Sequence, residues 1–286
     1  MPELPEVQTI INDLNRKIKG DVIVGFWTDW PKAIKNKKAA EFEKEIKGRK
    51  ILKAKRLGKN IFIELSGGKI LYIHLKMTGH LLIKPENKIL PSGKNYFDDK
   101  VNQYIHHIWR LKTGRTLDFS DLRKFGKIVL DDAEKIRNLQ EIRQLGIDVM
   151  SPAFSFQKFQ EILRKSRKKP IGIILMDQGI LSGIGNIYRS EILYEAGILP
   201  QREANGLSEK EAEEIFLAIK KVLKKAIKLR GTSDSDYRDT AGAPGGFQKV
   251  TKVYRKEGKK CTRCGSMVKR AKMGQRSVFF CLGCQR

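Results

Sequence analysis

The chain has 286 residues, and its 58 Lys and Arg against 32 Asp and Glu give a formal net charge of +26 at pH 7. The length suggests two domains, and a hydrophobic fraction of 40% can support packed cores. No apolar run reaches membrane-spanning length and no signal-peptide core opens the chain, so we expect a cytoplasmic protein without a membrane partner. The cationic excess favours nucleic acid as the partner, although a solubility bias would give the same balance.

The first seven residues combine an amine with two carboxylates. Removal of the start Met would leave Pro2 as the N-terminus, and its partly neutral secondary amine can form a Schiff base with a carbonyl-like carbon. Glu3 and Glu6 lie within reach, and Pro5 opens an apolar pattern of helical spacing. The alternative interpretation is that proline at position two is common and the carboxylates only favour a helix N-terminus.

Strand-like runs dominate the sequence that follows. Their spacing and their Gly-bearing turns predict an antiparallel sandwich or barrel. Residues 31–50 are Lys-rich and are expected to form a loop. Strands are predicted at 21–30, 51–57, 60–65, 69–75, 80–84, 104–112, 115–120 and 127–131.

Three short features in this half could carry chemistry. Lys59 occupies a tight Gly-Lys-Asn turn between two strands, where a solvated edge charge is the alternative. Met77 follows a strand end beside a glycine, where ordinary core packing is the alternative. Arg123 and Phe125 lie in a predicted turn, and a DNA-binding protein can use such a pair as a wedge that enters the base stack.

The pattern becomes helical after a segment bracketed by Gly146 and Pro152. Helices are predicted at 155–165, 170–177 and 208–229. Asn186 enters a helix from a Gly-x-Gly turn, which can present backbone N–H groups to a phosphate or can be a plain helix–helix turn. The polar, Gly-rich segment 231–247 is a long loop of the kind that is often functional.

The four cysteines form the most specific motif. They stand as two Cys-x2-Cys pairs separated by sixteen residues, which is the pattern of a tetrahedral zinc site. Because four thiolates leave no open position, one structural Zn²⁺ is expected. The predicted ligands are Cys261, Cys264, Cys281 and Cys284.

A β-hairpin is predicted between the two cysteine pairs, over residues 269–280. Arg276 would lie at its tip, where a strand pair can enter a groove of DNA. A solvated turn charge is the alternative.

Taken together, these landmarks resemble the formamidopyrimidine-DNA glycosylase family in the same order over essentially the whole chain. The resemblance implies an α+β multidomain fold. Its parts would be an N-terminal β-sandwich with flanking helices, a helical helix–two-turn–helix domain and a zinc-finger β-hairpin. We therefore expect a catalytic sandwich, a linker, a DNA-binding domain with a lesion lid at 231–247, and a four-cysteine zinc finger, at 1–132, 133–153, 154–248 and 249–286 respectively.

The resemblance also implies an activity. The protein would remove oxidised purines, such as 8-oxoguanine and formamidopyrimidines, from duplex DNA and then cleave the abasic site by β,δ-elimination. Pro2 would be the nucleophile, Glu3 the general acid on the sugar, and Glu6 would hold the N-terminus. Lys59 and Arg276 would assist proton transfer and phosphate elimination.

For DNA contacts, the resemblance implies that Met77, Arg123 and Phe125 fill the gap left by an everted nucleotide and that Asn186 binds the backbone. The chain departs from the family in two places that bear on DNA binding. Tyr104 stands where the family often carries a DNA-contacting His, and its hydroxyl can still donate to a phosphate. Gly172 replaces a usual Lys, so that Arg167 or Lys169 would substitute for it.

Two alternative functions stay open at this point. An endonuclease VIII-like enzyme would act on oxidised pyrimidines, but that branch usually begins Pro-Glu-Gly-Pro and this chain has Leu4. A non-catalytic zinc-ribbon DNA-binding protein would share the cysteine pattern without the amine chemistry. In every case the partner is double-stranded DNA, and we expect a monomer associated with the nucleoid.

Overall fold

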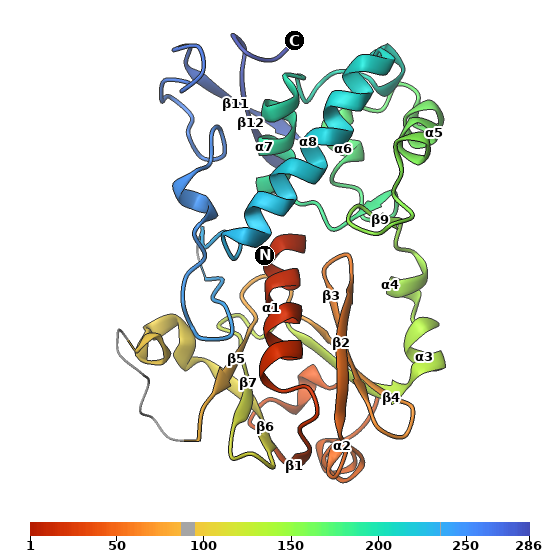
Figure 1. Cartoon of the computed structure of the whole chain (residues 1–286), viewed down its shortest axis with the longest axis vertical. Coiled ribbons are helices and arrows are strands. Elements are labelled where there is room, and N and C mark those ends of the chain that lie inside the picture. Colours follow the sequence, from red (N-terminus) through yellow and green to blue (C-terminus); the bar gives the residue numbers. More distant parts are fainter. Residues whose placement is uncertain (87–94, 235) are drawn as a thin grey trace. The chain divides into compact units, whose positions relative to one another are not determined.

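A computed structural model describes residues 1–86, 95–234 and 236–286. The chain separates into two compact units (Figure 1). The N-terminal unit comprises residues 1–143 and 229–248, and the C-terminal unit comprises 144–228 and 249–286. Among the helices that the structure describes, none is both long and apolar enough to cross a membrane.

Two antiparallel four-stranded sheets form the centre of the N-terminal unit, which confirms the predicted sandwich. One sheet has the order β1-β6-β7-β5 and the other β2-β3-β4-β8. The strands of the first sheet are β1 (Ile23–Thr28), β6 (Ile105–Leu111), β7 (Thr116–Ser120) and β5 (His80–Lys84). Those of the second are β2 (Ile51–Leu57), β3 (Asn60–Leu65), β4 (Lys69–His74) and β8 (Lys127–Asp132).

Both sheets and helix α1 (Leu4–Lys17) share one apolar core. The helix and its C-cap bury five side chains at the helical spacing seen in the sequence, namely Val7, Ile10, Ile11, Leu14 and Ile18. The Asn15 side chain fixes the helix to β2, because its amide donates to the Ala54 carbonyl and accepts from the Ala54 N–H, both at 2.8 Å. This packing sets the N-terminus of α1 beside the β2–β3 hairpin.

Residues 31–50 do not form the expected loop, and this prediction is wrong. The segment contains a 3-10 turn η1 (Pro31–Ala33) and helix α2 (Ala39–Ile46). Phe42 and Ile46 lie one helical turn apart and are fully buried, while the charged residues between them face solvent. Two apolar residues among many charges gave too weak a periodic signal to indicate this helix.

The predicted linker 133–153 carries short helices rather than plain coil. These are α3 (Ala133–Arg137) and α4 (Gln140–Arg143). Strand β9 (Ile147–Asp148) follows and pairs in parallel with β10 (Leu181–Ser182) of the C-terminal unit. Further 3-10 turns in the N-terminal unit are η2 (Tyr96–Asp98) and η3 (Lys100–Gln103).

The C-terminal unit is helical and ends in a β-hairpin, as predicted. Its helices are α5 (Phe156–Ser166), α6 (Ile171–Ile174), α7 (Asn186–Ala196) and α8 (Glu209–Lys228), with the turn η4 (Ala204–Gly206). The predicted capping box before α8 is present, because the Glu211 N–H donates to the Ser208 hydroxyl at 3.2 Å and the Ser208 N–H donates to Glu211 at 2.8 Å. The hairpin strands are β11 (Val268–Met273) and β12 (Arg276–Cys281).

Segment 229–248 groups with the N-terminal unit, which differs from the sequence assignment of 154–248 to one domain. The reason is a set of hydrogen bonds to the sandwich. The Ile83 N–H donates to the Thr240 carbonyl at 2.8 Å, and the Asn102 amide donates to the Gly242 carbonyl at 3.0 Å. The turn η5 (Phe247–Lys249) ends this segment.

Candidate active site and nucleic-acid interface

The N-terminus of α1 is built around two buried carboxylates. Glu3 and Glu6 are only 3% and 1% exposed, and Pro2 is buried beside them. They form a capping box, in which the Glu3 side chain accepts from the Glu6 N–H and Glu6 Oε2 accepts from the Glu3 N–H at 2.7 Å. The same residues that start the helix therefore fix the backbone next to Pro2.

The second oxygen of Glu6 holds segment 229–248. Glu6 Oε1 accepts from the Thr232 N–H at 2.7 Å. Gly231 approaches so closely, at φ +80°, that a Cβ there would lie 2.6 Å from Glu6 Oε1. Glu6 thus joins the backbone of Glu3 to the start of the 231–247 loop.

Lys59 lies at the tip of the β2–β3 hairpin and is only 6% exposed, so it is not a solvated edge charge. Gly58 supplies the positive φ of +57° that the first position of this two-residue turn requires. Arg56 Nε donates to Gln8 Oε1 at 2.7 Å and ties the hairpin to α1.

The residues of this corner shift the pKa of the Met1 amino group. Burial lowers the pKa of that amine, the carboxylates of Glu3 and Glu6 oppose the shift, and the charge of Lys59 adds to it. The structure therefore brings together four of the five residues predicted to be catalytic, all except Arg276, which lies in the C-terminal unit.

Met77, Arg123 and Phe125 also come together, on two neighbouring loops. Arg123 Nη1 lies 3.2 Å from Met77 Sδ, and its Cζ lies 4.7 Å from the centre of the Phe125 ring. Met77 and Phe125 remain 41% and 51% exposed. Large apolar side chains that stay exposed beside a cation fit a wedge better than a core.

Asp121, whose role the sequence analysis did not predict, fixes the loop that carries Arg123 and Phe125. It is 1% exposed and accepts from the Thr78 hydroxyl and from the N–H groups of Arg123, Phe125 and Gly126. The N–H groups of Phe125 and Gly126 both donate to Asp121 Oδ2, at 2.9 and 2.7 Å. Its place directly before the predicted turn was the available signal, because Asp often accepts from the backbone of its own turn.

Phe119 brings the two wedge loops together. A Cβ at Gly79 would lie 2.6 Å from the Phe119 ring, and one at Gly126 would lie 2.4 Å from it. Both loops therefore need glycine where they pack on this ring. Tyr104 is half-buried nearby, and its carbonyl accepts from the Asp121 N–H at 2.8 Å.

In the C-terminal unit, Asn186 and Arg276 line one open pocket of about 560 Å³. Arg276 follows a two-residue turn in which Gly274 and Gln275 both have positive φ, and its side chain is exposed. The other lining residues include Arg255 and Arg270, with Glu257 as the one carboxylate among the described lining. Three guanidinium groups at the start of a helix suit a phosphate.

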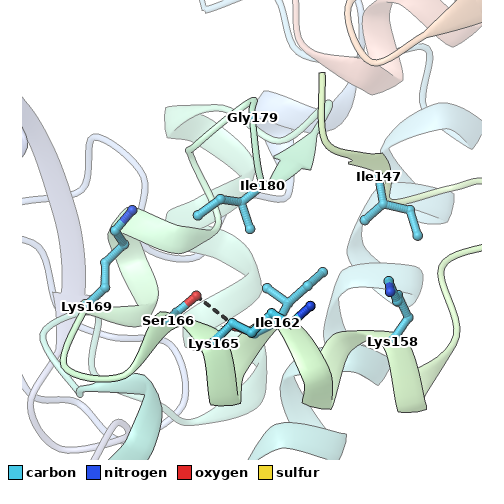
Figure 2. A pocket seen from close by; sticks show the side chains of 8 residues that line it. All are labelled: Ile147, Lys158, Ile162, Lys165, Ser166, Lys169, Gly179 and Ile180. Atoms are coloured by element: carbon cyan, nitrogen blue, oxygen red, sulfur yellow. Dashed lines mark hydrogen bonds between the residues drawn. The ribbon is translucent and has the colours of Figure 1, made fainter. Parts of the chain in front are cut away.

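A second pocket of about 420 Å³ lies along α5 (Figure 2). Lys158, Lys165 and Lys169 surround a lining of isoleucines. Two of these cations are already paired, Lys158 with Glu161 at 2.7 Å and Lys169 with Asp177 at 3.3 Å. Arg270 of the first pocket is likewise paired, with Glu257 at 3.4 Å. The first pocket is still the stronger phosphate candidate, because planar guanidinium groups match phosphate oxygens better than lysine ammonium groups do.

Arg167 is exposed at the C-cap of α5, with φ +45°. It is absent from the described lining of both pockets, so the structure does not bring it together with Asn186. Gly172 is buried, and a Cβ there would lie 2.7 Å from Met273 Sδ.

The four cysteines converge as predicted. Their sulfur atoms all lie within 4.8 Å of one another, with Cys261 and Cys284 3.7 Å apart and Cys264 and Cys281 3.4 Å apart. Tetrahedral Zn²⁺ with bonds of about 2.3 Å separates its sulfurs by about 3.8 Å, so the set fits a closed structural site. These four residues would hold the metal and leave no position for a substrate.

No role was predicted from the sequence for two charged residues of α7, Glu191 and Arg189, which support the pocket and the zinc site. Glu191 is 4% exposed and accepts from the N–H groups of Lys252, Val253 and Tyr254 at 2.8–2.9 Å, which fixes the chain that leads to the zinc site. Arg189 is fully buried and donates to Asn186 Oδ1 at 2.6 Å. The spacing of three residues from Asn186 was the only sequence signal for Arg189.

Three family models match the chain in order. They are the formamidopyrimidine-DNA glycosylase N-terminal domain over residues 1–128, the formamidopyrimidine-DNA glycosylase H2TH domain over 145–237, and a zinc finger found in FPG and IleRS over 258–286. The chain is 40% identical over 286 residues to the formamidopyrimidine-DNA glycosylase of Carboxydothermus hydrogenoformans, covering all of both chains. It is 37% identical to the protein of the same name from Pelotomaculum thermopropionicum, covering 100% of this chain and 99% of the relative.

Solved structures give the same match. The Lactococcus lactis Fpg in complex with DNA that contains an abasic site superimposes with a TM-score of 0.85 at 30% identity, and all of both chains is covered. The wild-type Lactococcus lactis Fpg with DNA that contains N7-benzyl-Fapy-dG matches with a TM-score of 0.85 at 31% identity, again over all of both chains.

Proposed function

The chain belongs to the formamidopyrimidine-DNA glycosylase family and is a base-excision repair enzyme for oxidised purines, and from that premise we propose that it also cleaves the abasic site through a Schiff base on Pro2. The observation that carries the proposal is the buried corner in which Pro2 adjoins Glu3, Glu6 and Lys59. Lowering the pKa of an amine increases its neutral, nucleophilic fraction near pH 7. The Pro2 nitrogen would meet the same surroundings once Met1 is removed.

The proposed covalent steps begin at the sugar of an everted nucleotide, because the reacting carbon is inaccessible inside the duplex. The Pro2 lone pair attacks C1′, the glycosidic bond breaks, and its electron pair leaves with the base, which gains a proton as the Pro2 nitrogen loses its own. Glu3 then protonates the ring oxygen; the C1′–O4′ bond opens as the nitrogen forms a cationic imine. Loss of a proton from C2′ breaks the C3′–O bond and expels the 3′ phosphate, and loss of a proton from C4′ breaks the C5′–O bond and expels the 5′ phosphate. Water then hydrolyses the imine and frees the Pro2 amine.

The remaining predicted residues have supporting roles in this proposal. Glu6 holds the N-terminus indirectly, through the Glu3 N–H and the Thr232 N–H, rather than as a proton donor. Lys59 and Arg276 would assist proton transfer and phosphate departure. A one-nucleoside gap is the expected product.

We propose DNA contacts on both units. Met77, Arg123 and Phe125 would fill the space of the everted nucleotide, since they are exposed and mutually packed. Asn186 would donate to the backbone from the positive end of α7. Tyr104 and Arg167 would add phosphate contacts at the surface. We place the enzyme in the cytoplasm at the nucleoid, acting as a monomer.

The test is cleavage of four duplexes that carry 8-oxoguanine, formamidopyrimidine, oxidised thymine or an abasic site. We expect strand cleavage at both purine lesions and at the abasic site, with both flanking phosphates left on the ends. Base release without strand cleavage would overturn the lyase proposal. Preferential cleavage at oxidised thymine would instead favour the endonuclease VIII-like alternative, against which Leu4 argues.

A further inference from the structure

Arg189 is the largest charged side chain that is fully buried in the described part of the chain, and it lies on α7 three residues after Asn186. We infer that Arg189, which is itself held by backbone carbonyls of α6 and β12, is a positioning residue that sets the orientation of the Asn186 amide. This inference rests on the proposed function, because it concerns how the same phosphate pocket is assembled.

The Arg189 guanidinium contacts three separate elements of the C-terminal unit. Nη2 donates to Asn186 Oδ1 at 2.6 Å, at the start of α7. Nη2 also donates to the Ser277 carbonyl on β12 at 3.1 Å, and Nη1 donates to the Gly172 carbonyl on α6 at 3.3 Å. A planar guanidinium has donors in a fixed fork, so these three contacts define one arrangement of the three elements.

The contact to Asn186 fixes which face of its amide is offered to a ligand. Arginine only donates hydrogen bonds, so the Asn186 oxygen must face Arg189. Both N–H donors of the amide are then left for the pocket that Asn186 lines. A donor face is the one that a phosphate requires, and a flipped amide would present an acceptor to a negatively charged group.

The contact to Ser277 fixes the Arg189 guanidinium. Ser277 follows Arg276 directly on β12, and its carbonyl holds Nη2 of Arg189 in place from the hairpin side. Met273 and Gly274, at the other side of the turn, pack on α6, where a Cβ on Gly172 would meet Met273 Sδ at 2.7 Å and the Pro200 carbonyl at 2.9 Å. Gly172 therefore leaves room for the hairpin tip while its carbonyl accepts from Arg189.

This geometry changes the expected substitute for the Lys that the resemblance places at position 172. Arg167 is exposed at the end of α5, and Lys169 pairs with Asp177 at 3.3 Å. The cation that reaches the Gly172 backbone is Arg189. Arg189 therefore supplies a buried cation beside the Gly172 backbone, while a phosphate contact at the surface is left to Arg167.

The test measures affinity for a duplex that carries a stable abasic-site analogue, using the full-length zinc-loaded protein. Arg189→Met removes the donors and keeps the length, and we expect affinity to fall about tenfold, as for one lost hydrogen bond to a charged group. The matched control is Arg202→Met, which removes an Arg paired with Glu211 in the same unit and should leave affinity unchanged. Equal affinity of Arg189→Met and wild type would overturn the inference.

Two further readouts separate positioning from a merely structural role. Asn186→Ala should already lose the phosphate contact, so Arg189→Met should add little in that background; full additivity would contradict a role through Asn186. The slope of log affinity against log salt should not change in Arg189→Met, whereas Arg276→Met should flatten it by about 0.9 for each lost phosphate contact. A flatter slope in Arg189→Met would mean that Arg189 contacts DNA itself.

If Arg189→Met does not fold, the same cycle with Arg189→Lys decides, because Lys keeps the charge on a compact ammonium without the planar fork. Its loss should be smaller than about tenfold and should vanish in the Asn186→Ala background; a loss that persists there overturns the inference. The wild type reports on the proposed function separately, since a wild type that neither binds nor cleaves lesion DNA would refute that function. Binding by the wild type with no effect at Arg189 would refute the positioning role alone.

Discussion

At the scale of single residues, exposure distinguishes the side chains that would meet DNA from those that hold them. Phe125 is about half exposed, while Asp121 below it is buried and accepts from its backbone N–H. Removing Phe125 or Met77 should therefore cost little folding stability. Removing Asp121 would take the acceptor from the buried Gly126 N–H and from the part-buried Phe125 N–H, at about 1–3 kcal/mol for a buried donor.

The wedge residues yield a substrate-dependent prediction. Phe125→Ala and Met77→Ala should weaken capture of a lesion in duplex DNA more than cleavage of an abasic site in a single strand. The reason is that the wedge offsets unstacking, which costs a few kcal/mol only where a stack exists. Single-turnover rates on the two substrates measure the difference, and equal losses on both would count against a wedge.

His107 gives a prediction about pH. Burial lowers the pKa of His107 to about 3, and its ring packs among Phe26, Trp109 and Phe119. The folded pKa lies below the unfolded value of about 6.5, so the unfolded state takes up the proton first and stability is lost as pH falls from about 6.5 towards 3. The loss from this residue should approach about 1.4 kcal/mol per pH unit.

Urea unfolding between about pH 7 and pH 4 measures this slope in the wild type and in His107→Gln. Above about pH 7 both proteins should show the same pH dependence. If the free energy of unfolding depends on pH equally in the wild type and in His107→Gln, then His107 does not contribute to the loss of stability at low pH.

At the scale of elements, segment 229–248 is clamped to α1. Arg230 pairs with Asp13 and, at 2.6 Å, with Asp239, while the Thr240 hydroxyl donates to Asp13 at 2.7 Å. Burial acts against ionisation of Asp13, but the hydrogen bonds from Arg230 and Thr240 outweigh it and lower its pKa. The clamp should therefore persist at neutral pH and weaken only as the pH falls below about 4.

Asp13→Asn should loosen this clamp. We expect a loss of about 1–3 kcal/mol of stability and faster amide exchange across 231–247, because a charged acceptor becomes neutral. Arg16→Met is the matched control, since it removes the 67%-exposed partner of the same carboxylate and should cost less than about 1 kcal/mol. Unchanged exchange in Asp13→Asn would contradict the clamp.

The elements also show how far sequence reasoning reached. Strong local signals, such as the apolar spacing of α1 and the cysteine pairs, predicted the sandwich, the helices and the zinc-site ligands. Helix α2 was missed because only Phe42 and Ile46 mark its buried face. The role of Arg189 depends on partners on α6 and β12 that folding brings close, which no local pattern encodes, and the same holds for the grouping of 229–248 with the N-terminal unit. Asp121 did have a local signal, its place directly before the predicted turn, which the sequence analysis did not use.

At the scale of the whole molecule, the zinc site and the sandwich have separate cores. The cluster around the cysteines contains Tyr194, Val253 and Phe279, whereas the sandwich core draws on α1 and the two sheets. Because metal binding supplies folding energy to such small sites, chelation should release the β11–β12 hairpin and leave the N-terminal unit folded.

Amide exchange of β11–β12 against β2–β3, in zinc-loaded and chelated protein, measures this separation. Cys264→Ser should act like chelation, and both should weaken DNA binding because Arg276 loses its support. Restoring zinc to the chelated wild type provides the control. Unchanged DNA affinity in fully metal-free protein would contradict a structural role for the metal in binding.

The proposed mechanism depends on Pro2 being the nucleophile. Lys59 is the alternative nucleophile within the same buried corner. A lysine amine starts near a pKa of about 10.4, whereas a terminal amine starts about two units lower. A secondary amine also gives a cationic imine without first gaining a proton. Pro2→Gly should keep a weaker primary amine, and an added N-terminal residue should abolish imine formation while leaving lesion binding largely intact.

The most direct measurement is borohydride reduction during turnover on a duplex with an abasic site, followed by mass spectrometry of the trapped protein–DNA adduct. We expect a covalent link at Pro2 that disappears when the N-terminus is extended. A link at Lys59, or trapping that survives a blocked N-terminus, would contradict it.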